Sequence, residues 1–517
     1  MNTRTAQVVL NTITSYIRFA VSLLVWFFLT PFIINTVGRN DFGLWSLTFS
    51  VIGFFGLLDF GFGTGVVKYV AECKGAKNVE RRNRILSTLA IVYLTISLIA
   101  CTSVGALSFF YNHLFSIPDG EHEKAYALLW ILAGRSIFLG LPLSLFRGIL
   151  FGEQKIYLIN LIQGVAIVVY ALTSWIVLEK GMGIIALAWI NFGAMLLEHL
   201  GYIYFSYKEV SGLRISFSLA EKKLFREVAS FSIYSFIVNV SNLILLKTDP
   251  IIIKFFMPLS SVAIYALALK IAENALLLIK QFVNVLTPLI ADFKGSGDEQ
   301  KIRFILINCT KFALAPAVMI AVGGSVFARE GLYFWVGPEF VMGAPVLIVL
   351  MIAFTMSVPQ LIASNVLTMT GHHKITARVS AMSILINIVC SILLIMPLGF
   401  IGVALGTLIA TLIIDIFYIL KIVFKEYQIN YLDYIYRAVL TAVAPGVLQL
   451  VLTYGMKIWF PPENLAMIAF ELLPGVLLYS SIFFLFFVEP SEKRLLREKL
   501  FARISIFGIF SVFKFKH

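Results

Sequence analysis

Long apolar stretches separated by short polar connections recur from one end of this 517-residue chain to the other. A helix that crosses a lipid bilayer needs about 20 mostly apolar residues. The chain is 60% hydrophobic and only 13% charged, whereas soluble domains are about 45–50% apolar and about 25% charged. The sequence therefore predicts an all-α integral membrane protein.

The positions of the apolar stretches predict about fourteen transmembrane helices. They lie near residues 12–35, 42–66, 85–110, 125–147, 156–178, 184–205, 228–255, 261–291, 304–327, 341–369, 375–398, 402–424, 434–459 and 465–488. The first stretch is longer than the apolar core of a signal peptide and lacks an A-x-A cleavage site, so we expect it to remain as the first span.

The net charge of +13 is distributed unevenly along the chain, and this distribution predicts its orientation. Alternate connections, including 68–84, 208–226 and 294–311, hold most of the lysines and arginines. The opposite connections hold only Arg39, Lys124, Lys180, Lys254, Arg329 and Lys457. Because basic connections stay in the cytoplasm, we expect both termini there.

The basic residues of 491–517 alternate with apolar ones and predict an amphipathic helix on the cytoplasmic leaflet. The membrane topology explains the excess of positive charge. No nucleic-acid partner is therefore expected.

One sequence offset recurs when the chain is compared with itself. The pairs that lie 219 positions apart are Pro31 and Pro250, Gly152 and Gly371, Lys155 and Lys374, Ile156 and Ile375, and Gly183 and Gly402. We therefore expect residues 1–210 and 211–427 to form two parallel six-helix lobes, with two extra helices over 428–490. Transporters with such repeats bind their cargo between the halves, so a central cavity is expected.

Several ionisable side chains fall inside the predicted spans, where a charge is costly and usually faces a cavity or a partner. They are Arg18, Asp59, Arg135, Glu198, Lys247, Asp249, Lys270, Glu273, Lys280, Asp415 and, in the last span, Glu471. Helical spacing places Arg18 on a polar face with Asn11, Ser15 and Ser22, and Asp249 on another with Ser235, Asn239 and Asn242. Such faces point away from lipid. They indicate a water-filled cavity with cationic groups.

Ion pairs that only fix helix packing are the alternative interpretation of these charges. Arg18 and Asp59 are expected at similar depth on adjacent spans and could pair. Lys270 and Glu273 are three residues apart on one helix, a spacing that favours pairing. Arg135 has no acid on its own span, which makes it the best candidate for a cavity residue.

No pattern in the sequence is typical of catalysis or of metal binding. Cys73, Cys101, Cys309 and Cys390 are far apart and have no metal-ligand spacing, so neither a disulfide nor a structural metal is expected. A Walker A motif is also missing. The outer connections are short, whereas a membrane enzyme of glycan assembly usually keeps a sizeable outer loop. We expect a protein that is not an enzyme and has no cofactor.

Three stretches near the N-terminus carry a family resemblance. They read TPFIINTVGRNDFGLW from Thr30, LLDFGFG from Leu57 and VKYVAE from Val67, and a GEQK turn follows at Gly152. Together with IYALA at Ile264 and the repeat, they resemble the Wzx-like O-antigen and polysaccharide flippases. These polysaccharide biosynthesis proteins belong to the multidrug/oligosaccharidyl-lipid/polysaccharide exporter superfamily. The resemblance covers the first twelve spans.

The resemblance implies a flippase of a bacterial inner membrane that works by alternating access. Its cargo would be an oligosaccharide repeat unit linked to a polyprenyl pyrophosphate of the undecaprenyl type, as needed for O-antigen or lipopolysaccharide. H+ or Na+ could drive transport, and a glycan polymerase or ligase could receive the product. The candidates for headgroup contact are Arg18, Arg135, Lys247, Lys270, Asn239 and Asn242. The candidates for ion coupling are Asp59, Glu198, Asp249, Glu273 and Asp415.

Other functions remain open at this point. A cation-coupled multidrug exporter of the same superfamily would be expected to have twelve spans and an acid-lined lobe, whereas several candidates here are basic. A membrane-embedded glycan-assembly enzyme would need the outer loop that is missing. A scaffold without transport would require every intramembrane charge to be paired.

Overall fold

The computed structural model describes residues 3–295, 298–490 and 492–493, and every regular element in these ranges is helical. The expected all-α membrane fold is confirmed. The chain divides into two compact units. The first contains Met1–Ala266 and Ser391–Val403, and the second contains Leu267–Cys390 and Ala404–His517.

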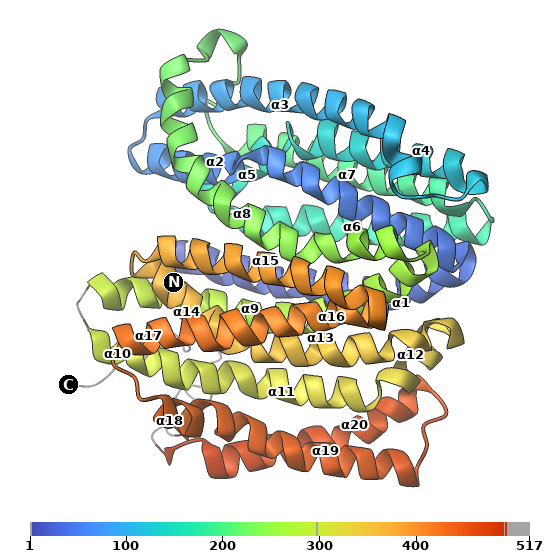
Figure 1. The fold of residues 1–517 in the computed structure, drawn as a ribbon. Coiled ribbons are helices and arrows are strands. Elements are labelled where there is room, and N and C mark those ends of the chain that lie inside the picture. The colour runs from blue at the N-terminus through green and yellow to red at the C-terminus, as the bar shows by residue number, and fades with distance from the viewer. Residues whose placement is uncertain (1–2, 296–297, 491, 494–517) are drawn as a thin grey trace. The chain divides into compact units, whose positions relative to one another are not determined.

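The first unit is built mainly from the N-terminal half of the chain (Figure 1). Its helices are α1 (Thr3–Phe55), α2 (Phe62–Gly75), α3 (Val79–Leu114), α4 (His122–Gly134), α5 (Ser144–Gly152), α6 (Ile156–Glu179), α7 (Gly183–Glu209) and α8 (Lys222–Phe256). Helix α6 packs between α1 and α7, and α2 packs against α5.

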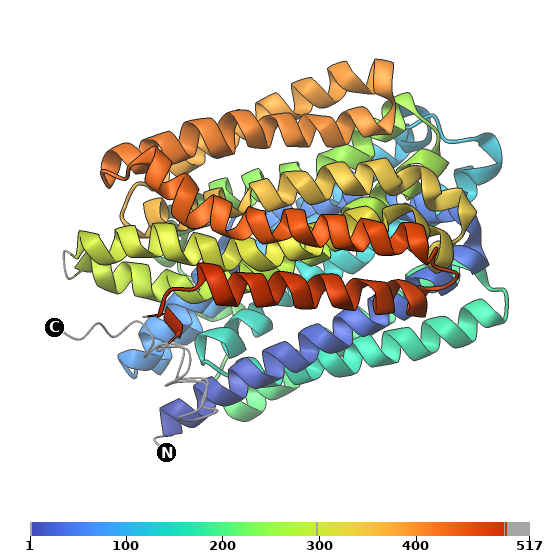
Figure 2. The same ribbon diagram turned by 90° about the horizontal axis from the view of Figure 1, so that it is seen from below.

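The second unit contains shorter helices and the C-terminal hairpin. Its helices are α10 (Glu299–Phe304), α11 (Thr310–Val326), α12 (Ala328–Val336), α13 (Ala344–Met356), α14 (Val358–Met369), α17 (Leu420–Glu426), α18 (Tyr431–Tyr434), α19 (Thr441–Trp459) and α20 (Leu465–Ile482). Three helices contribute residues to both units, namely α9 (Leu259–Gly295), α15 (His373–Leu398) and α16 (Phe400–Ala410). Helices α11, α19 and α20 lie side by side (Figures 1 and 2).

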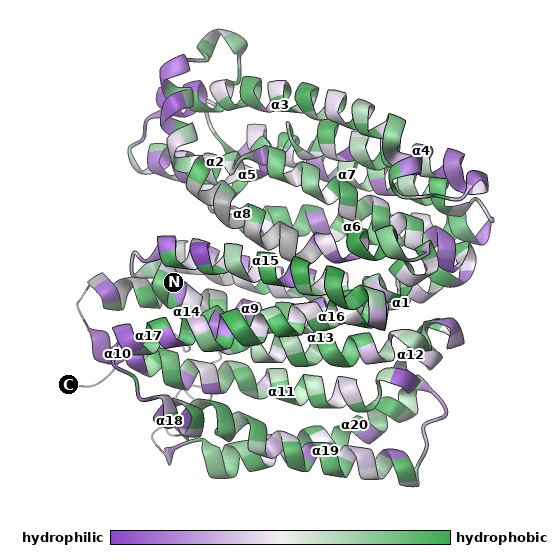
Figure 3. Ribbon diagram, viewed as in Figure 1, coloured by the Kyte–Doolittle hydropathy of each residue, from purple (hydrophilic) through white to green (hydrophobic). Residues whose placement is uncertain are grey.

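Within the described residues, eleven helices are long and apolar enough to cross a membrane, or twelve if the bent pair α4–α5 is one span. Green, apolar residues predominate along most of the long helices, and purple, polar residues gather towards many helix ends (Figure 3). Water is unavailable to backbone groups inside a bilayer, so helices that satisfy their own hydrogen bonds are the expected structure there.

The chain departs from regular α-helix at three places, one between the first two predicted spans and two within predicted spans. Helix α1 departs from helical geometry at Gly38, where φ is 83°, a value that glycine adopts without steric cost. The predicted span over 42–66 is interrupted by a 3₁₀ turn at Gly56–Asp59, before α2 begins at Phe62. The span predicted over 125–147 bends by 41° between α4 and α5, where Pro142 cannot continue a helix.

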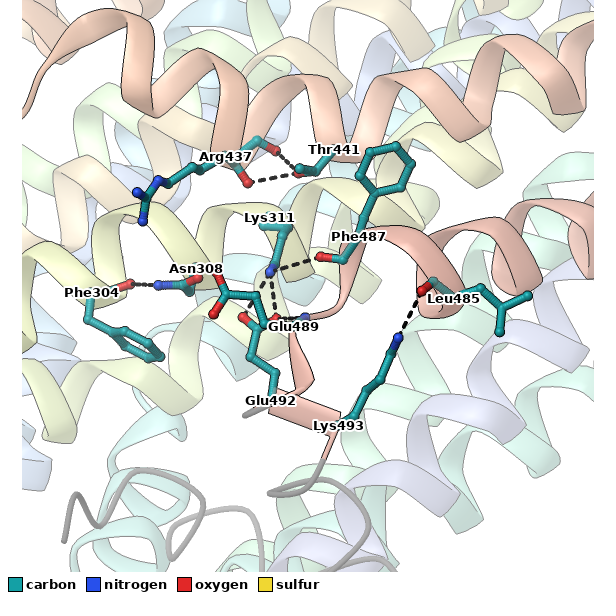
Figure 4. Close-up of polar contacts among 11 residues, drawn as sticks. Phe304, Asn308, Lys311, Arg437, Thr441, Leu485, Phe487, Glu489, Glu492 and Lys493 are labelled. Atoms are coloured by element: carbon teal, nitrogen blue, oxygen red, sulfur yellow. Dashed lines mark hydrogen bonds and ion pairs between the residues drawn. The ribbon is translucent and has the colours of Figure 1, made fainter.

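The C-terminal end of the described chain is fixed to α11 by a buried ion pair. The Lys311 ammonium lies 2.7 Å from the Glu492 carboxylate, and both side chains are almost fully buried. Lys311 also donates to the Phe487 carbonyl, and Glu492 accepts from the Glu489 amide (Figure 4). The charges are thus paired and hydrogen-bonded, as a buried ion pair requires.

Candidate functional site

A cavity of about 700 Å³ lies within the first unit. Its volume falls in the range of about 300–1,000 Å³ that is usual for small-molecule sites. The charged side chains on its wall are Asp59, Arg135, Arg147 and Lys247. Three cations and one acid therefore face this space, together with Phe49, Ser136 and Ser144.

The acid on the cavity wall already has partners inside the protein. Asp59 ends the 3₁₀ turn, and its carboxylate accepts a hydrogen bond of 2.7 Å from the Tyr93 hydroxyl. It also accepts from the Gly63 amide in the first turn of α2. A carboxylate at a helix N-terminus is stabilised by the helix dipole. Asp59 therefore holds the start of α2 in place, and basic side chains outnumber acidic ones on the cavity wall by three to one.

Arg135 is the first residue of a π-helical stretch, Arg135–Gly140, that follows α4. Such π-helical insertions often occur at functional sites. Its guanidinium lies over the Phe49 ring, at 5.7 Å from the ring centre. Its Nε atom is buried and has no hydrogen-bond partner, and no ion pair joins Arg135 to another described residue. Glu198 attracts it only through space. The guanidinium is thus positioned but available to a ligand.

Arg147 is the cavity residue that the sequence interpretation missed. The predicted span over 125–147 ends at this position, and Arg147 is not among the ionisable side chains placed inside the spans. In the structure it lies on α5, past the bend, and lines the cavity with Arg135. Pro142 was the available signal, because a proline within a predicted span indicates a bend that redirects the following helical turn.

Arg18 does not line this cavity but belongs to a contact between α1 and α6. Its Nε donates to the Asn160 carbonyl oxygen at 3.0 Å, and the Asn160 amide reaches Ser15. Asn11 accepts from the Tyr157 amide. The polar face predicted to line a cavity therefore packs against another helix. The alternative ion pair of Arg18 with Asp59 is not among the described contacts, in which Arg18 binds Asn160 and Asp59 accepts from Tyr93. Polar contacts of this kind hold spanning helices together.

The remaining candidates in the first unit are distributed over other contacts. Glu198 accepts from Tyr202 at 2.5 Å and from Gln163 at 3.2 Å. Asp249 is buried and accepts from the Tyr265 hydroxyl. The side chains of Asn239 and Asn242 lie outside the described part of the structure.

In the second unit, Lys270 and Glu273 form the ion pair that their spacing predicted, at 3.3 Å. Asp415 lies in a π-helical stretch, Thr411–Ile419. No hydrogen bond or ion pair joins Asp415 to another described residue. The carboxyl group of Asp415 is also partly buried.

Comparison with known proteins identifies the family. The model of a family described as "Polysaccharide biosynthesis protein" matches residues 7–294, more than half of the chain. The chain belongs to the polysaccharide biosynthesis protein family. The stretches that carried the resemblance fall inside the match, and the predicted membership among polysaccharide biosynthesis proteins is confirmed.

Relatives of this polysaccharide biosynthesis protein occur in bacteria and archaea. EpsK of Bacillus subtilis, named as an uncharacterized membrane protein, is 22% identical over 75% of this chain and 77% of its own length. "Probable flippase AglR" of Haloferax volcanii is 22% identical over 74% of this chain and 76% of its own length.

Solved transporter structures share the fold. The lipid II flippase MurJ in an inward closed conformation matches with a TM-score of 0.68, at 18% identity over 92% of this chain and 97% of that chain. An inward-facing multidrug resistance transporter of the MATE family and MOP superfamily matches with a TM-score of 0.69, at 14% identity over 82% of this chain and 99% of that chain. At these identities the likeness concerns the fold alone.

Proposed function

We propose that this protein is a flippase that moves an oligosaccharide linked to a polyprenyl pyrophosphate from the cytoplasmic to the outer face of the membrane. The observation that carries the proposal is the basic wall formed by Arg135, Arg147 and Lys247 around one cavity. The family supports a glycan precursor as cargo, and relatives named as flippases point in the same direction.

A pyrophosphate explains why such a cavity needs these residue types. It is a dense anion, and an unpaired charge is costly to move into a low-dielectric interior. Arginine donates bidentate hydrogen bonds to phosphate oxygens, while lysine acts as a compact point charge. Arg135 and Arg147 would hold the phosphates, Lys247 would add charge, and the polyprenyl tail would remain in lipid.

We propose fourteen spans with both termini in the cytoplasm. The twelve long apolar segments become fourteen if α1 counts as two spans on either side of Gly38 and if α8 is also a span. The internal repeat supports this count. Helices α1 and α8 each contain one proline of the repeat, Pro31 and Pro250, which lie 219 positions apart. Residues 1–210 and 211–427 would be the two lobes that alternate access.

An ion gradient would drive the cycle, with Asp415 as the first candidate for coupling. A carboxyl group inside a spanning segment without a described partner can bind H+ or Na+ at low cost to packing. Asp59 and Glu273 are weaker candidates because they already have protein partners, Tyr93 and Lys270. Glu198 and Asp249 also accept hydrogen bonds within the first unit.

Export of cationic drugs is the alternative within the same fold. The cavity wall argues against it, because three cations surround one carboxylate that is already hydrogen-bonded. Like charges repel, so a cationic drug would enter this space unfavourably. An anionic headgroup has the complementary charge.

The proposal is tested by the fate of the lipid-linked oligosaccharide in cells that lack the gene. We expect the precursor to accumulate on the cytoplasmic face and to disappear on complementation. Mass spectrometry of the accumulated lipid would identify the sugars. Unchanged glycan together with altered tolerance to cationic dyes would instead support the drug-exporter function.

A further inference from the structure

Helices α19 and α20 pack side by side in the second unit (Figures 1 and 2). Three polar side chains of these helices are buried. The exposed fractions of Gln449, Thr453 and Glu471 are 0%, 0% and 1%. None of them belongs to the cavity of the first unit. The sequence singles out only one of the three, Glu471, because its carboxyl group falls within a predicted span.

Four oxygen atoms of these side chains have no hydrogen-bond partner among the described residues. They are both carboxylate oxygens of Glu471, the amide oxygen of Gln449 and the hydroxyl oxygen of Thr453. The Gln449 nitrogen is satisfied, because it donates to the Met319 carbonyl of α11 at 3.1 Å. Leaving buried polar atoms unpaired costs about 1–3 kcal/mol each, and more for a charged group. So many unpaired oxygens at one helix contact call for a common partner.

Gly475 brings these side chains together by letting the two helices approach closely. A Cβ atom at this position would lie 2.4 Å from the Thr453 hydroxyl and 3.3 Å from the Gln449 side chain. Glu471 precedes Gly475 by one helical turn and therefore lies on the same face of α20. Pro474, between them, has no N–H to donate to the Phe470 carbonyl, which frees a backbone oxygen in the same turn.

The charged neighbours of Glu471 are already engaged with each other. Lys457 of α19 lies 2.9 Å from Glu330 of α12 and donates to the Val326 carbonyl of α11. Lys457 and Glu330 influence Glu471 through space, but neither forms an ion pair with it among the described contacts. Val326 and Ile468 belong to a small apolar cluster in the same region. The carboxylate is thus buried beside a pair that does not neutralise it.

We propose that Gln449, Thr453 and Glu471 form a binding site for a monovalent metal cation, with Na+ as its ligand. Every unpaired atom is an oxygen, the ligand type that hard cations prefer. A proton on Glu471 would add a single O–H donor to this group of oxygens, whereas a metal ion contacts several oxygens at once. Mg²⁺ and Ca²⁺ are less suitable, since their sites use more oxygens and usually more carboxylates. The site would fasten α19 to α20 within the C-terminal hairpin, whatever the cargo is.

Purified full-length protein in nanodiscs provides the test. Thermal unfolding is followed in NaCl, KCl and choline chloride at equal ionic strength, and binding of ²²Na+ is measured at equilibrium. We expect Na+ to raise the melting temperature saturably, because a ligand that binds only the folded state stabilises it. No rise and no ²²Na+ binding in the wild type would overturn the proposal.

Variants show whether the response of the melting temperature to Na+ arises at this site. Glu471→Gln should abolish the Na+ response, whereas Glu463→Gln, an exposed acid in the connection before α20, should retain it. Thr453→Val should weaken Na+ affinity about tenfold, or about 1.4 kcal/mol, and it keeps the test open if Glu471→Gln does not fold. A full response in both Glu471→Gln and Thr453→Val would contradict the proposal. So would stabilisation by acid alone with no effect of Na+, which would show a proton at Glu471.

Discussion

The guanidinium carbon of Arg135 lies 5.7 Å from the centre of the Phe49 ring, and no hydrogen bond or ion pair joins Arg135 to another described residue. A cation–π contact contributes about 0.5–2 kcal/mol. It orients the guanidinium but uses none of its five N–H donors. The side chain is therefore held on the cavity wall with its hydrogen-bonding capacity intact for an anion.

Replacing Arg135 is expected to stop transport without preventing insertion. Arg135→Ala removes both the charge and the planar fork, while Arg135→Lys keeps the charge and should restore transport in part. Accumulation of lipid-linked oligosaccharide in complemented cells measures the effect, and membrane abundance is checked by immunoblot. Arg226→Ala, at an exposed arginine outside the cavity, is the control. Normal transport by Arg135→Ala would remove this residue from the site.

Arg147 is expected to contribute to the same binding step. Losing one charge-assisted contact costs about 1.5–3 kcal/mol, so Arg147→Gln should raise the cargo concentration needed for half-maximal transport by at least about tenfold. Transport kinetics in reconstituted vesicles would show this change. An unchanged concentration dependence would mean that the headgroup does not reach α5.

Arg18 is expected to stabilise the protein rather than to bind cargo. Its hydrogen bond to Asn160 joins α1 to α6, so Arg18→Gln should lower the melting temperature while transport per folded molecule stays close to wild type. Asn160→Leu should have a similar effect, since it removes the partner. The opposite pattern, normal stability with lost transport, would return Arg18 to the headgroup site.

The ion pair between Lys311 and Glu492 is expected to stabilise the second unit. Removing one partner of a buried pair costs about 3–5 kcal/mol, so Lys311→Ala should lower the melting temperature strongly. The double variant Lys311→Met, Glu492→Leu should recover much of the loss because no unpaired charge remains. Arg437→Ala is the control, since the Arg437–Asp433 pair is largely exposed and such pairs contribute about 0–1 kcal/mol. Equal effects of Lys311→Ala and Arg437→Ala would contradict this account.

Cysteine labelling is expected to show the proposed orientation. With both termini in the cytoplasm, Asn464→Cys should react with an impermeant maleimide in intact cells, and Lys77→Cys only after permeabilisation. Native Cys73 should add little background at neutral pH. It is buried, and burial raises the pKa of its thiol, so the reactive thiolate forms only at higher pH. Labelling of Lys77→Cys in intact cells would reverse the topology.

The apolar runs predicted the membrane fold because hydropathy is a local property of the sequence. Spacing also predicted the Lys270–Glu273 pair, which forms within one helix. The partner of Arg18 was not predictable, since periodicity tells which side of a helix is polar but not which helix covers it. Asn160 is 142 positions away in the chain. Arg147 was missed because the bend at Pro142 changes which residues share a face.

Transport in a defined system tests the central claim most directly. Vesicles are reconstituted with lipid-linked oligosaccharide and the protein, and an impermeant periodate reagent oxidises only sugars on the outer leaflet. We expect the oxidised share to rise beyond the outer-leaflet share with wild-type protein and to stay at that share with Arg135→Ala. If the oxidised share stays at the outer-leaflet share with wild-type protein, even when a Na+ or H+ gradient is imposed, the protein is not a flippase for this cargo.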